Sequence, residues 1–237
     1  MSNVQNPIVS REEWLKARKE HLAQEKEFTR QRDALSKARR EMPWVKIGND
    51  YRFQTASGEA SLVDLFEGRS QLIVQHFMFG EDWEEGCTSC SFWADGYDGF
   101  QVHLGHRDAT MKSVSNAPLD KLLAYRDRMG WSFDWVSSLG SEFNRDFNVS
   151  FTEDEVKDGS ATYNYKPSTF PMSEAPGISI FYKNENGEVF HTYSCYSRGL
   201  DMLNAAYHYM DLLPKGRDEQ NLPHSMSWLK RHDQYED

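Results

Sequence analysis

The sequence is poor in cysteine and has no long apolar run. Only three of its 237 residues are cysteine, too few and too unevenly spaced for a disulfide framework. The most apolar stretch, residues 72–80, is interrupted by Gln75 and His76 and falls short of the roughly 18 apolar residues of a membrane span. The first residues, MSNVQNPIVSREEW, lack the basic start and apolar middle of a secretory signal. We therefore expect a cytoplasmic protein that crosses no membrane.

Positive charge is also scarce. Lys and Arg number 27 against 37 Asp and Glu, a formal net charge of -10, which disfavours nucleic acid and anionic membranes as partners. One segment differs, because residues 11–42 carry 10 basic and 7 acidic side chains, and their interspersed signs are typical of a solvated helix face. Aromatic residues make up 14 % and charged residues 27 % of the chain, a composition typical of a globular protein.

The N-terminal segment, residues 1–43, is predicted to be a helical appendage. Ser10 and Glu13 form a capping box, and the helix should run to about Glu41, because Pro43 cannot continue it. Its apolar positions are too sparse to form a core, so the helix should lie on a larger body or on another subunit. These positions are Trp14, Leu15, Leu22, Phe28 and Leu35.

Residues 44–213 show short strands that alternate with helices, which favours an α/β fold with parallel crossovers. A hairpin around Ser57 and Gly58 comes first. The nearly continuous apolar run 72–79 predicts a central buried strand. Further strands are expected at 110–114, 135–137, 178–182 and 188–193, and helices at 87–104, 118–129 and 200–213; residues 214–237 form a tail.

This order, with C-x-x-C at the start of a helix after the central strand, resembles the thioredoxin fold. The stretch YRFQTASGEASLVDLFEGRSQLIVQHFMF resembles the N-terminal part of peroxiredoxins and of membrane-tethered thioredoxin-like reductases, where a hairpin and a short helix precede the central strand. More closely, PWVKIGNDYRF, QLIVQHFMFGEDWEEGCTSCSFWAD and GEVFHTYSCYSRGLDML resemble an uncharacterised, mainly bacterial family of the thioredoxin-like clan, domain of unknown function number 899. The resemblance implies much about the fold and little about the substrate.

The resemblance implies roles for three residues. Cys87 matches the attacking cysteine of the clan, Cys90 the resolving cysteine, and Pro176 the proline, usually cis, that faces the disulfide. Three features depart from the thioredoxin pattern: Gly86 replaces the Trp before the first cysteine, Thr-Ser replaces Gly-Pro between the cysteines, and 26 residues, 150–175, precede the proline. These departures leave substrate and mechanism open.

The C-x-x-C pair suits redox chemistry for a physical reason. A cysteine at a helix N-terminus lies where unpaired N–H groups favour the thiolate, which is the nucleophile, and a second cysteine one turn on can resolve a mixed disulfide. Four carboxylates within six residues of Cys87 oppose this, because nearby negative charge disfavours a thiolate. If these carboxylates point at the sulfur, Cys87 should be a poor oxidant and a slow nucleophile. We expect a reducing-type couple and not an oxidase. The carboxylates belong to Glu81, Asp82, Glu84 and Glu85.

Cys195 has two competing interpretations. The strand at 188–193 should return to the active-site end of a thioredoxin-type sheet and bring Cys195 near the pair, as an auxiliary thiol that protects an oxidised Cys87. Alternatively Cys195 is a small buried residue without chemistry, as free cysteines often are. A Cys₃His zinc site is a structural rival for all three cysteines, but no second paired motif accompanies C-x-x-C.

Other residues near the motif are mostly expected to be core. His76 and His191 lie within strands, where a satisfied core histidine is the ordinary case. Trp83 and Trp93 are predicted to form walls of a pocket for an apolar substrate. The polar segment 150–175 fits equally a lid over the site and a disordered excursion.

The leading functional hypothesis is a thiol–disulfide oxidoreductase in which Cys87 attacks and Cys90 resolves. Peroxiredoxin-like peroxide reduction is an alternative, although the Thr and Pro that usually accompany a peroxidatic cysteine are missing before Cys87. A non-enzymatic binding protein of the same fold is another. The expected partners are a disulfide-containing protein or small thiol substrate, an electron donor that the sequence does not name, and a second copy bound through the N-terminal helix. No cofactor and no metal are expected.

Overall fold

The computed structural model describes residues 6–236 and contains a mixed eight-stranded sheet of order β1-β10-β9-β4-β5-β6-β2-β3. The central strands β4, β5 and β6 run parallel, whereas β9 lies antiparallel to β4 and β10 antiparallel to β9. The strands are β1 (Val45–Lys46), β2 (Arg52–Thr55), β3 (Gly58–Ser61), β4 (Gln71–His76), β5 (Ala109–Ser115), β6 (Trp135–Ser137), β9 (Gly177–Lys183) and β10 (Val189–Tyr196), with a separate hairpin of β7 (Thr162–Tyr163) and β8 (Lys166–Pro167).

This topology confirms the predicted thioredoxin-like fold. The unit β4, helix, β5, then antiparallel β9 and β10, is its defining core, with β4 in the centre. The predicted hairpin extension is also present, because β2 and β3 pair and β2 joins the sheet beside β6. The helices are α1 (Arg11–Arg40), η1 (Asp64–Phe66), α2 (Thr88–Ala94), α3 (Gln101–Gly105), α4 (Leu119–Arg128), α5 (Phe143–Asp146), α6 (Glu153–Asp158), η2 (Ser197–Leu203), α7 (Ala205–Met210) and η3 (His232–Gln234).

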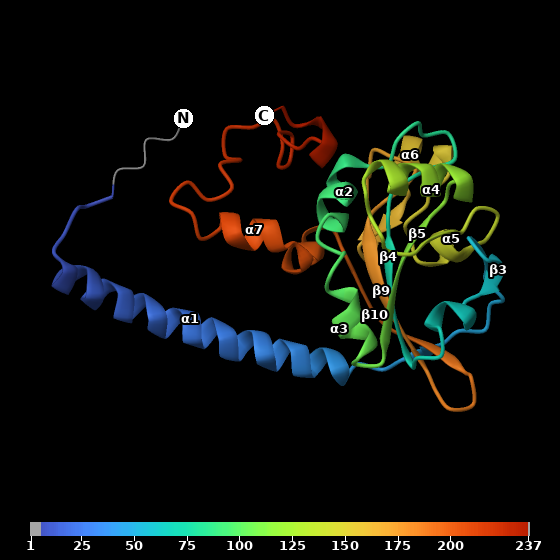
Figure 1. Cartoon of the computed structure of the whole chain (residues 1–237), viewed down its shortest axis with the longest axis horizontal. Helices are drawn as coiled ribbons and strands as arrows, with labels where there is room; N and C mark the ends of the chain where they lie inside the picture. The colour runs from blue at the N-terminus through green and yellow to red at the C-terminus, as the bar shows by residue number, and fades with distance from the viewer. Residues whose placement is uncertain (1–5, 237) are drawn as a thin grey trace.

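Helices cover both faces of the sheet, with α2 and α3 on one side and α5 on the other (Figure 1). On the α2 side, Cys90 and Ala94 pack with Phe77, Tyr125 and Trp135 in one aromatic cluster. On the α5 side, the core is a second cluster that contains Leu72, Val74, Phe143 and Phe181. The alternation along β4 sends successive side chains to these two faces. Burial on both sides explains why this strand reads as a nearly continuous apolar run.

Two predicted helices are each divided in the structure. The helix expected over 87–104 splits into α2 and α3, and the intervening turn contains Gly99 at φ 90°, a left-handed conformation that glycine adopts readily. The helix expected over 200–213 splits into η2 and α7 at Asn204. This residue is extended, and its Oδ1 accepts a hydrogen bond from Tyr207 N at 2.9 Å, so it begins a new helix.

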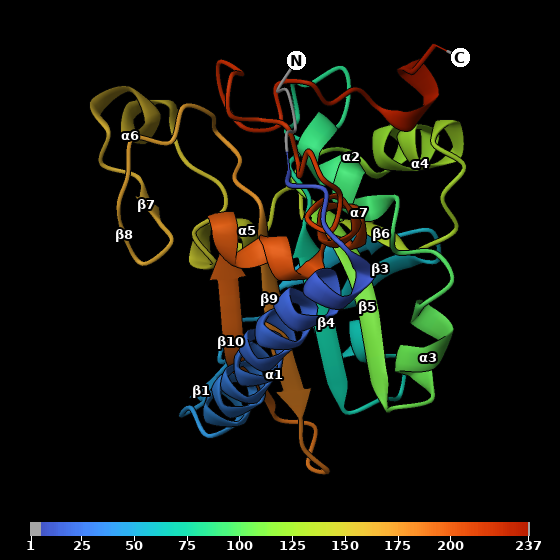
Figure 2. The same ribbon diagram turned by 90° about the vertical axis from the view of Figure 1, so that its left-hand side faces the viewer.

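The N-terminal helix has the predicted capping box. Ser10 Oγ accepts from Glu13 N at 3.2 Å, and Glu13 Oε2 accepts from Ser10 N at 2.9 Å. The helix runs to Arg40 without a single buried residue, and it extends from the sheet as a separate arm (Figures 1 and 2). Among residues 6–236, none of the helices combines the length and the apolar run that a membrane crossing needs.

Candidate dithiol site

The two cysteines of the motif lie where β4 passes into α2. Cys87 is the N-cap of α2, and its Sγ accepts a hydrogen bond from Cys90 N at 3.4 Å. Ser89 Oγ lies 3.2 Å from the same sulfur, and Cys87 N donates to Met78 O at 3.1 Å. Both cysteines are free thiols; Cys90 is buried and Cys87 partly accessible. The first sulfur is thus held in a turn that aims donors at it.

The two thiols have opposite acidities. A hydrogen bond from the Cys90 thiol, helped by Ser89, lowers the pKa of Cys87 to about 6 despite its burial. Burial raises the pKa of Cys90 well above its ordinary value, and the adjacent Cys87 adds to the effect. Because the pair shares a proton, the first deprotonation belongs to Cys87. This asymmetry matches an attacking thiolate beside a resolving thiol.

The expected acidic suppression of Cys87 is therefore wrong. The Glu85 carboxylate forms ion pairs with Arg128 and, at 2.7 Å, with Arg231. Glu81 and Asp82 line a different pocket. The main causes of the pKa shift of Cys87 are Cys90, burial and Ser89, and none of the four carboxylates is among them. Sequence proximity overstated their effect because the chain turns between these residues and the sulfur.

Gly86 explains one departure from thioredoxin. A Cβ atom at this position would lie 2.8 Å from the Phe77 ring and 2.9 Å from the Tyr125 ring. Real Cβ contacts are not this short, so any larger residue before Cys87 would displace the aromatic cluster. Phe77, directly after β4, and Tyr125 of α4 occupy the space beside Gly86.

The pair opens into a mainly apolar cavity of about 280 Å³, which we call the dithiol cavity. The predicted residues Trp93 and Pro176 line it with Cys87 and Cys90. Trp93 is fixed by a hydrogen bond from its Nε1 to Leu200 O at 2.9 Å. The other lining residues are Gln75, His76, Met78, Ser89, Tyr97, Tyr163, Phe170, Met172, Gly177, Ile178, Ser197, Arg198, Leu200, Asp201 and Met226.

Pro176 reaches the cavity, but its peptide bond differs from the expectation. No peptide bond within the described residues is cis, so the bond between Ala175 and Pro176 is trans. The carbonyl of Pro176 accepts a hydrogen bond from Tyr163 Oη at 2.8 Å. Tyr163 Oη in turn accepts from Ser197 N at 2.9 Å. The proline therefore faces the thiols from a loop anchored by the 150–175 segment.

That segment is folded over the site. It forms α6 and the β7–β8 hairpin, and Phe151, Ala161 and Tyr163 pack in a cluster with Tyr196. It also contributes Tyr163, Phe170 and Met172 to the cavity wall. Of the two interpretations of its composition, the structure supports the lid.

The C-terminal tail forms a further wall, which the sequence pattern did not reveal. Met226 lines the cavity. Arg231, whose side chain is 13 % exposed, donates to Gly86 O and to Tyr125 Oη at 2.8 Å each and pairs with Glu85. These contacts hold the tail against the residue that precedes the attacking cysteine. Single long-range hydrogen bonds leave no periodic signal in a sequence.

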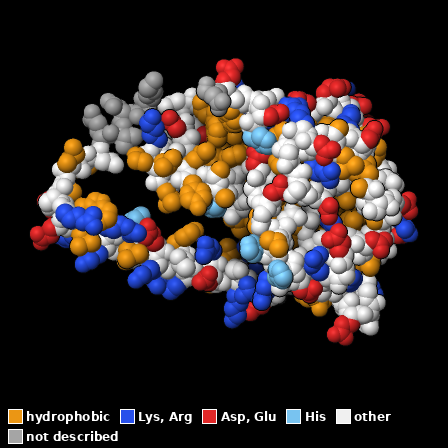
Figure 3. All heavy atoms as spheres, in the orientation of Figure 1, with side chains coloured by type: hydrophobic (Ala, Val, Ile, Leu, Met, Phe, Trp, Pro, Cys, Tyr) orange, Lys and Arg blue, Asp and Glu red, His pale blue; other side chains and the backbone are white. Residues whose placement is uncertain are grey.

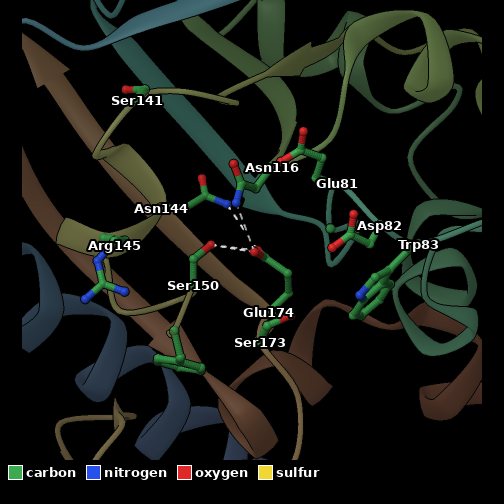
Figure 4. Close-up of a pocket in the computed structure, with 12 residues that line it drawn as sticks. Glu81, Asp82, Trp83, Asn116, Ser141, Asn144, Arg145, Ser150, Ser173 and Glu174 are labelled. Carbon is green, nitrogen blue, oxygen red and sulfur yellow. Dashed lines mark hydrogen bonds between the residues drawn. The ribbon is translucent and has the colours of Figure 1, made fainter. Parts of the chain in front are cut away.

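Trp83 does not line the dithiol cavity, so this part of the prediction is wrong. It lies in a second pocket of about 260 Å³, which we call the polar pocket, and no cysteine lines that pocket. There the buried carboxylate of Glu174 accepts hydrogen bonds from Ser150, Asn116 and Asn144 (Figure 4). Burial raises the pKa of Glu174 to about 7 in spite of these donors.

Cys195 lies one layer behind the cavity. It pairs with Ile178 across β9 and β10 and packs with Ile178 and Leu200, both of which line the cavity. The Cys195 side chain does not line it, and burial raises its pKa. An auxiliary redox role remains a prediction. No group of three His, Cys, Asp or Glu within residues 6–236 is arranged to hold a metal, so the geometry does not support the zinc alternative.

The strand histidines belong to a buried polar chain. His76 Nε2 lies 2.7 Å from Ser179 Oγ, which lies 2.7 Å from Ser194 Oγ. The latter lies 2.7 Å from His191 Nε2. Burial lowers the pKa of His76 to about 3, so the ring is neutral. This arrangement fits the expectation of core histidines.

The sequence also matches a known protein family. Residues 3–235 match the family described as "Bacterial protein of unknown function (DUF899)". The chain belongs to this family. A search of curated protein sequences finds no significant match.

Solved structures with similar backbones include several peroxiredoxins. A PrxQ mutant from Xylella fastidiosa is 10% identical, with a TM-score of 0.44 over 70% of this chain and 95% of that chain. Peroxidoxin BcpB from Mycobacterium tuberculosis is 12% identical, with a TM-score of 0.44 over 68% and 95%. The mitochondrial 2-Cys peroxiredoxin from Plasmodium falciparum is 11% identical, with a TM-score of 0.40 over 69% and 91%.

Proposed function

We propose that this DUF899 protein is a thiol–disulfide oxidoreductase. The observation that carries the proposal is the placement of two free thiols at the start of α2, where Cys87 Sγ accepts a hydrogen bond from Cys90 N and both cysteines line one cavity. Cys87 has a pKa of about 6 and ionises at neutral pH, whereas Cys90 remains protonated. These directions agree with the geometry, because an ionised attacking thiol beside a protonated resolving thiol suits thiol–disulfide exchange.

The proposed reaction has two steps. The Cys87 thiolate attacks one sulfur of the substrate disulfide, which forms a mixed disulfide and releases the other sulfur as a thiol after protonation. The Cys90 thiol then loses its proton and attacks Cys87, which releases the second thiol and leaves a Cys87–Cys90 disulfide. Two electrons pass from the protein to the substrate. A separate thiol donor must reduce the protein again.

In this proposal, Pro176 and Trp93 form walls of the cavity that position the substrate beside the thiols. Pro176 presents a backbone fixed by Tyr163, and the ring of Trp93 is held by Leu200 O. Both face the space in front of the thiols. We also propose a cytoplasmic location, since a cysteine pair that cycles between dithiol and disulfide is typical of reducing compartments.

The proposal is tested by equilibrating purified protein with defined glutathione mixtures and trapping the free thiols of Cys87 and Cys90. We expect a reversible two-electron transition with a potential of roughly -200 to -270 mV, between those of glutaredoxins and thioredoxin. A pair that never oxidises across the gradient would contradict the proposal and favour a binding protein. Stoichiometric zinc in the purified protein would contradict it as well.

A further inference from the structure

We propose that the dithiol cavity accepts a small, uncharged disulfide with apolar substituents and a hydrogen-bond-accepting oxygen, in preference to a polypeptide. This inference rests on the proposed oxidoreductase function and specifies its substrate class. The volume is the first support. About 280 Å³ lies just below the range of roughly 300–1,000 Å³ that is usual for small-molecule sites.

Two segments of the chain, residues 150–175 and the C-terminal tail, cover the cavity. A reductase that acts on proteins would need these sides to be open. Phe170 and Met172 of the 150–175 segment and Met226 of the tail all line it. Arg231 keeps the tail in place through Gly86 and Tyr125. A folded protein substrate would have to displace two packed segments to bring its disulfide to Cys87, whereas a small molecule would not.

The charge of the lining disfavours ionic substrates. Arg198 and Asp201 are its charged side chains besides the thiols, and they pair with each other at 2.8 Å. Asp201 also accepts from Arg217 at 3.0 Å. No unpaired charged side chain of the lining therefore remains to compensate a carboxylate or ammonium group of a ligand. Moving such a group from water into an apolar cavity without a partner is costly.

Two buried polar groups supply the specific contacts. Tyr97 and Gln75 line the cavity and are 3 % and 4 % exposed. Gln75 Oε1 accepts from Ser113 Oγ at 2.7 Å, but the Gln75 amide nitrogen and the Tyr97 hydroxyl have no hydrogen-bond partner among residues 6–236. Buried polar groups are rarely left unpaired. Burial raises the pKa of Tyr97, so its hydroxyl stays a donor. Both groups can donate to an oxygen of the ligand.

The test measures single-turnover reduction of each probe by the dithiol form of the protein. The rate is monitored as the loss of free protein thiols. Three small disulfides share the reacting bond: the dimethyl ester of 3,3′-dithiodipropionate, its diacid, and dibutyl disulfide. Glutathione disulfide and insulin complete the set. Each rate is divided by the rate with free dithiothreitol to remove differences in intrinsic reactivity. We expect the ester to react at least tenfold faster than the diacid or glutathione disulfide and faster than dibutyl disulfide.

The variant Tyr97→Phe isolates the hydrogen bond. It keeps the ring and should reduce the advantage of the ester over dibutyl disulfide. Phe170→Ala should reduce the discrimination against glutathione disulfide. A preference of the unmodified protein for insulin or glutathione disulfide would overturn the substrate class while leaving the oxidoreductase function intact. No reduction of any probe would overturn both.

A second proposal rests on a different region, the surface of α1. This helix contains no buried residue, although most helical stability in proteins comes from packing. Phe28 is 66 % exposed, and Trp14 and Leu35 are also exposed. Across an open space lies a second exposed apolar group around α7, which includes Leu212 at 80 % exposure. Figure 3 shows the space with hydrophobic side chains on both of its sides.

We infer that a second copy of the chain occupies this space, so that each α1 packs against the α7 region of its partner. One chain carries both surfaces of such an interface, the apolar positions of α1 and those around α7. Within one chain the two surfaces do not pack against each other. Charge also favours the pairing. The helix has 10 Lys or Arg against 6 Asp or Glu, and the rest of the chain has 17 against 31, so the net charges of the helix and of the partner's remaining chain are opposite and favour association.

Light scattering on the full-length chain during size exclusion tests the inference. We expect a dimer at micromolar concentration, and a monomer for the double variant Phe28→Glu and Leu35→Glu. Ala23→Glu, which adds a charge at an exposed position on the other side of the same helix, should remain dimeric. A monomeric unmodified chain would contradict the inference. A dimer that survives the double substitution, with helix content retained by circular dichroism, would contradict it equally.

Discussion

The dithiol cavity and the polar pocket lie on either side of one short segment, yet the pKa values of their titratable groups shift in opposite directions. Glu174 faces the polar pocket, and Pro176, two residues later, faces the dithiol cavity. The Glu174 carboxyl has a raised pKa of about 7, whereas the Cys87 thiol has a lowered pKa of about 6.

The difference teaches that hydrogen bonding, and not burial alone, decides which group ionises. Both groups are removed from water, which disfavours the charged form. At Cys87 the donors, led by the Cys90 thiol, outweigh this cost. At Glu174 the donors Ser150, Asn116 and Asn144 do not, so the carboxyl is held partly neutral. The dithiol cavity therefore favours the Cys87 thiolate, whereas the polar pocket favours the protonated form of Glu174.

The largest expected effect is the loss of the attacking sulfur. Cys87→Ser should reduce single-turnover disulfide reduction on the order of a thousandfold or more, because the nucleophile is removed. Cys90→Ser should instead stop the reaction after the first step. Mass spectrometry should then find the substrate half covalently attached to Cys87. Attachment at Cys195 in this variant would contradict the assigned roles.

The next effect concerns the polar pocket and appears in stability. The folded pKa of Glu174 is raised from the ordinary 4.5 to about 7, so the folded state holds its proton more tightly than the unfolded state. Its stabilising contribution is complete below pH 4.5 and is lost as pH rises through about 7. The loss is about 3 kcal/mol in the free energy of unfolding.

Denaturation by urea at several pH values measures this slope in the unmodified chain and in Glu174→Gln. The glutamine cannot ionise, so the variant should lose most of the decline between pH 4.5 and pH 7. Glu81→Gln, an exposed carboxylate in the same pocket, is the matched control and should keep the decline. An unchanged slope in Glu174→Gln would show that Glu174 is not the buried titrating group.

A smaller effect separates the two tryptophans. Trp93→Phe should lower the rate with a small apolar disulfide roughly tenfold, because a wall of the cavity and its hydrogen bond to Leu200 are lost. Trp83→Phe changes the polar pocket and should stay within about twofold of the unmodified chain. Equal losses in both variants, with unchanged unfolding transitions, would mean that the two pockets act as one site.

The smallest effect is expected at Cys195. Its side chain lies behind Ile178 and Leu200, outside the cavity wall. Cys195→Ser should therefore change the single-turnover rate by less than about twofold. The peroxide sensitivity of Cys87 in this variant decides the auxiliary role. Faster loss of Cys87 to overoxidation would support protection by Cys195, and an unchanged rate would identify it as a packing residue.

Much of the fold follows from local patterns in the sequence. The capping box at Ser10, the apolar run of β4 and the strand expected at 188–193 each identified an element that the structure contains. The breaks at Gly99 and Asn204 were missed. A helix-forming composition on both sides of a break does not reveal that one residue adopts a non-helical conformation.

The site was predictable only in part. The spacing of Cys87 and Cys90 identified the thiols, and Trp93 and Pro176 were correctly expected to share a cavity with them. The closing residues Met226 and Arg231 come from a tail more than 130 residues later, and their contacts depend on tertiary structure. Trp83 is only four residues from Cys87 yet faces another pocket. Proximity along the chain misplaced Trp83, and it gave no indication of Met226 and Arg231.

The central claim is that the site makes Cys87 a thiolate at neutral pH. The most direct measurement is the rate at which iodoacetamide alkylates each cysteine of the native protein across pH 4–10, followed by peptide mass spectrometry. The account predicts a midpoint near pH 6 for Cys87, and slow alkylation of Cys90 until much higher pH. A midpoint at the unperturbed value of about 8.5 for Cys87 would contradict the account.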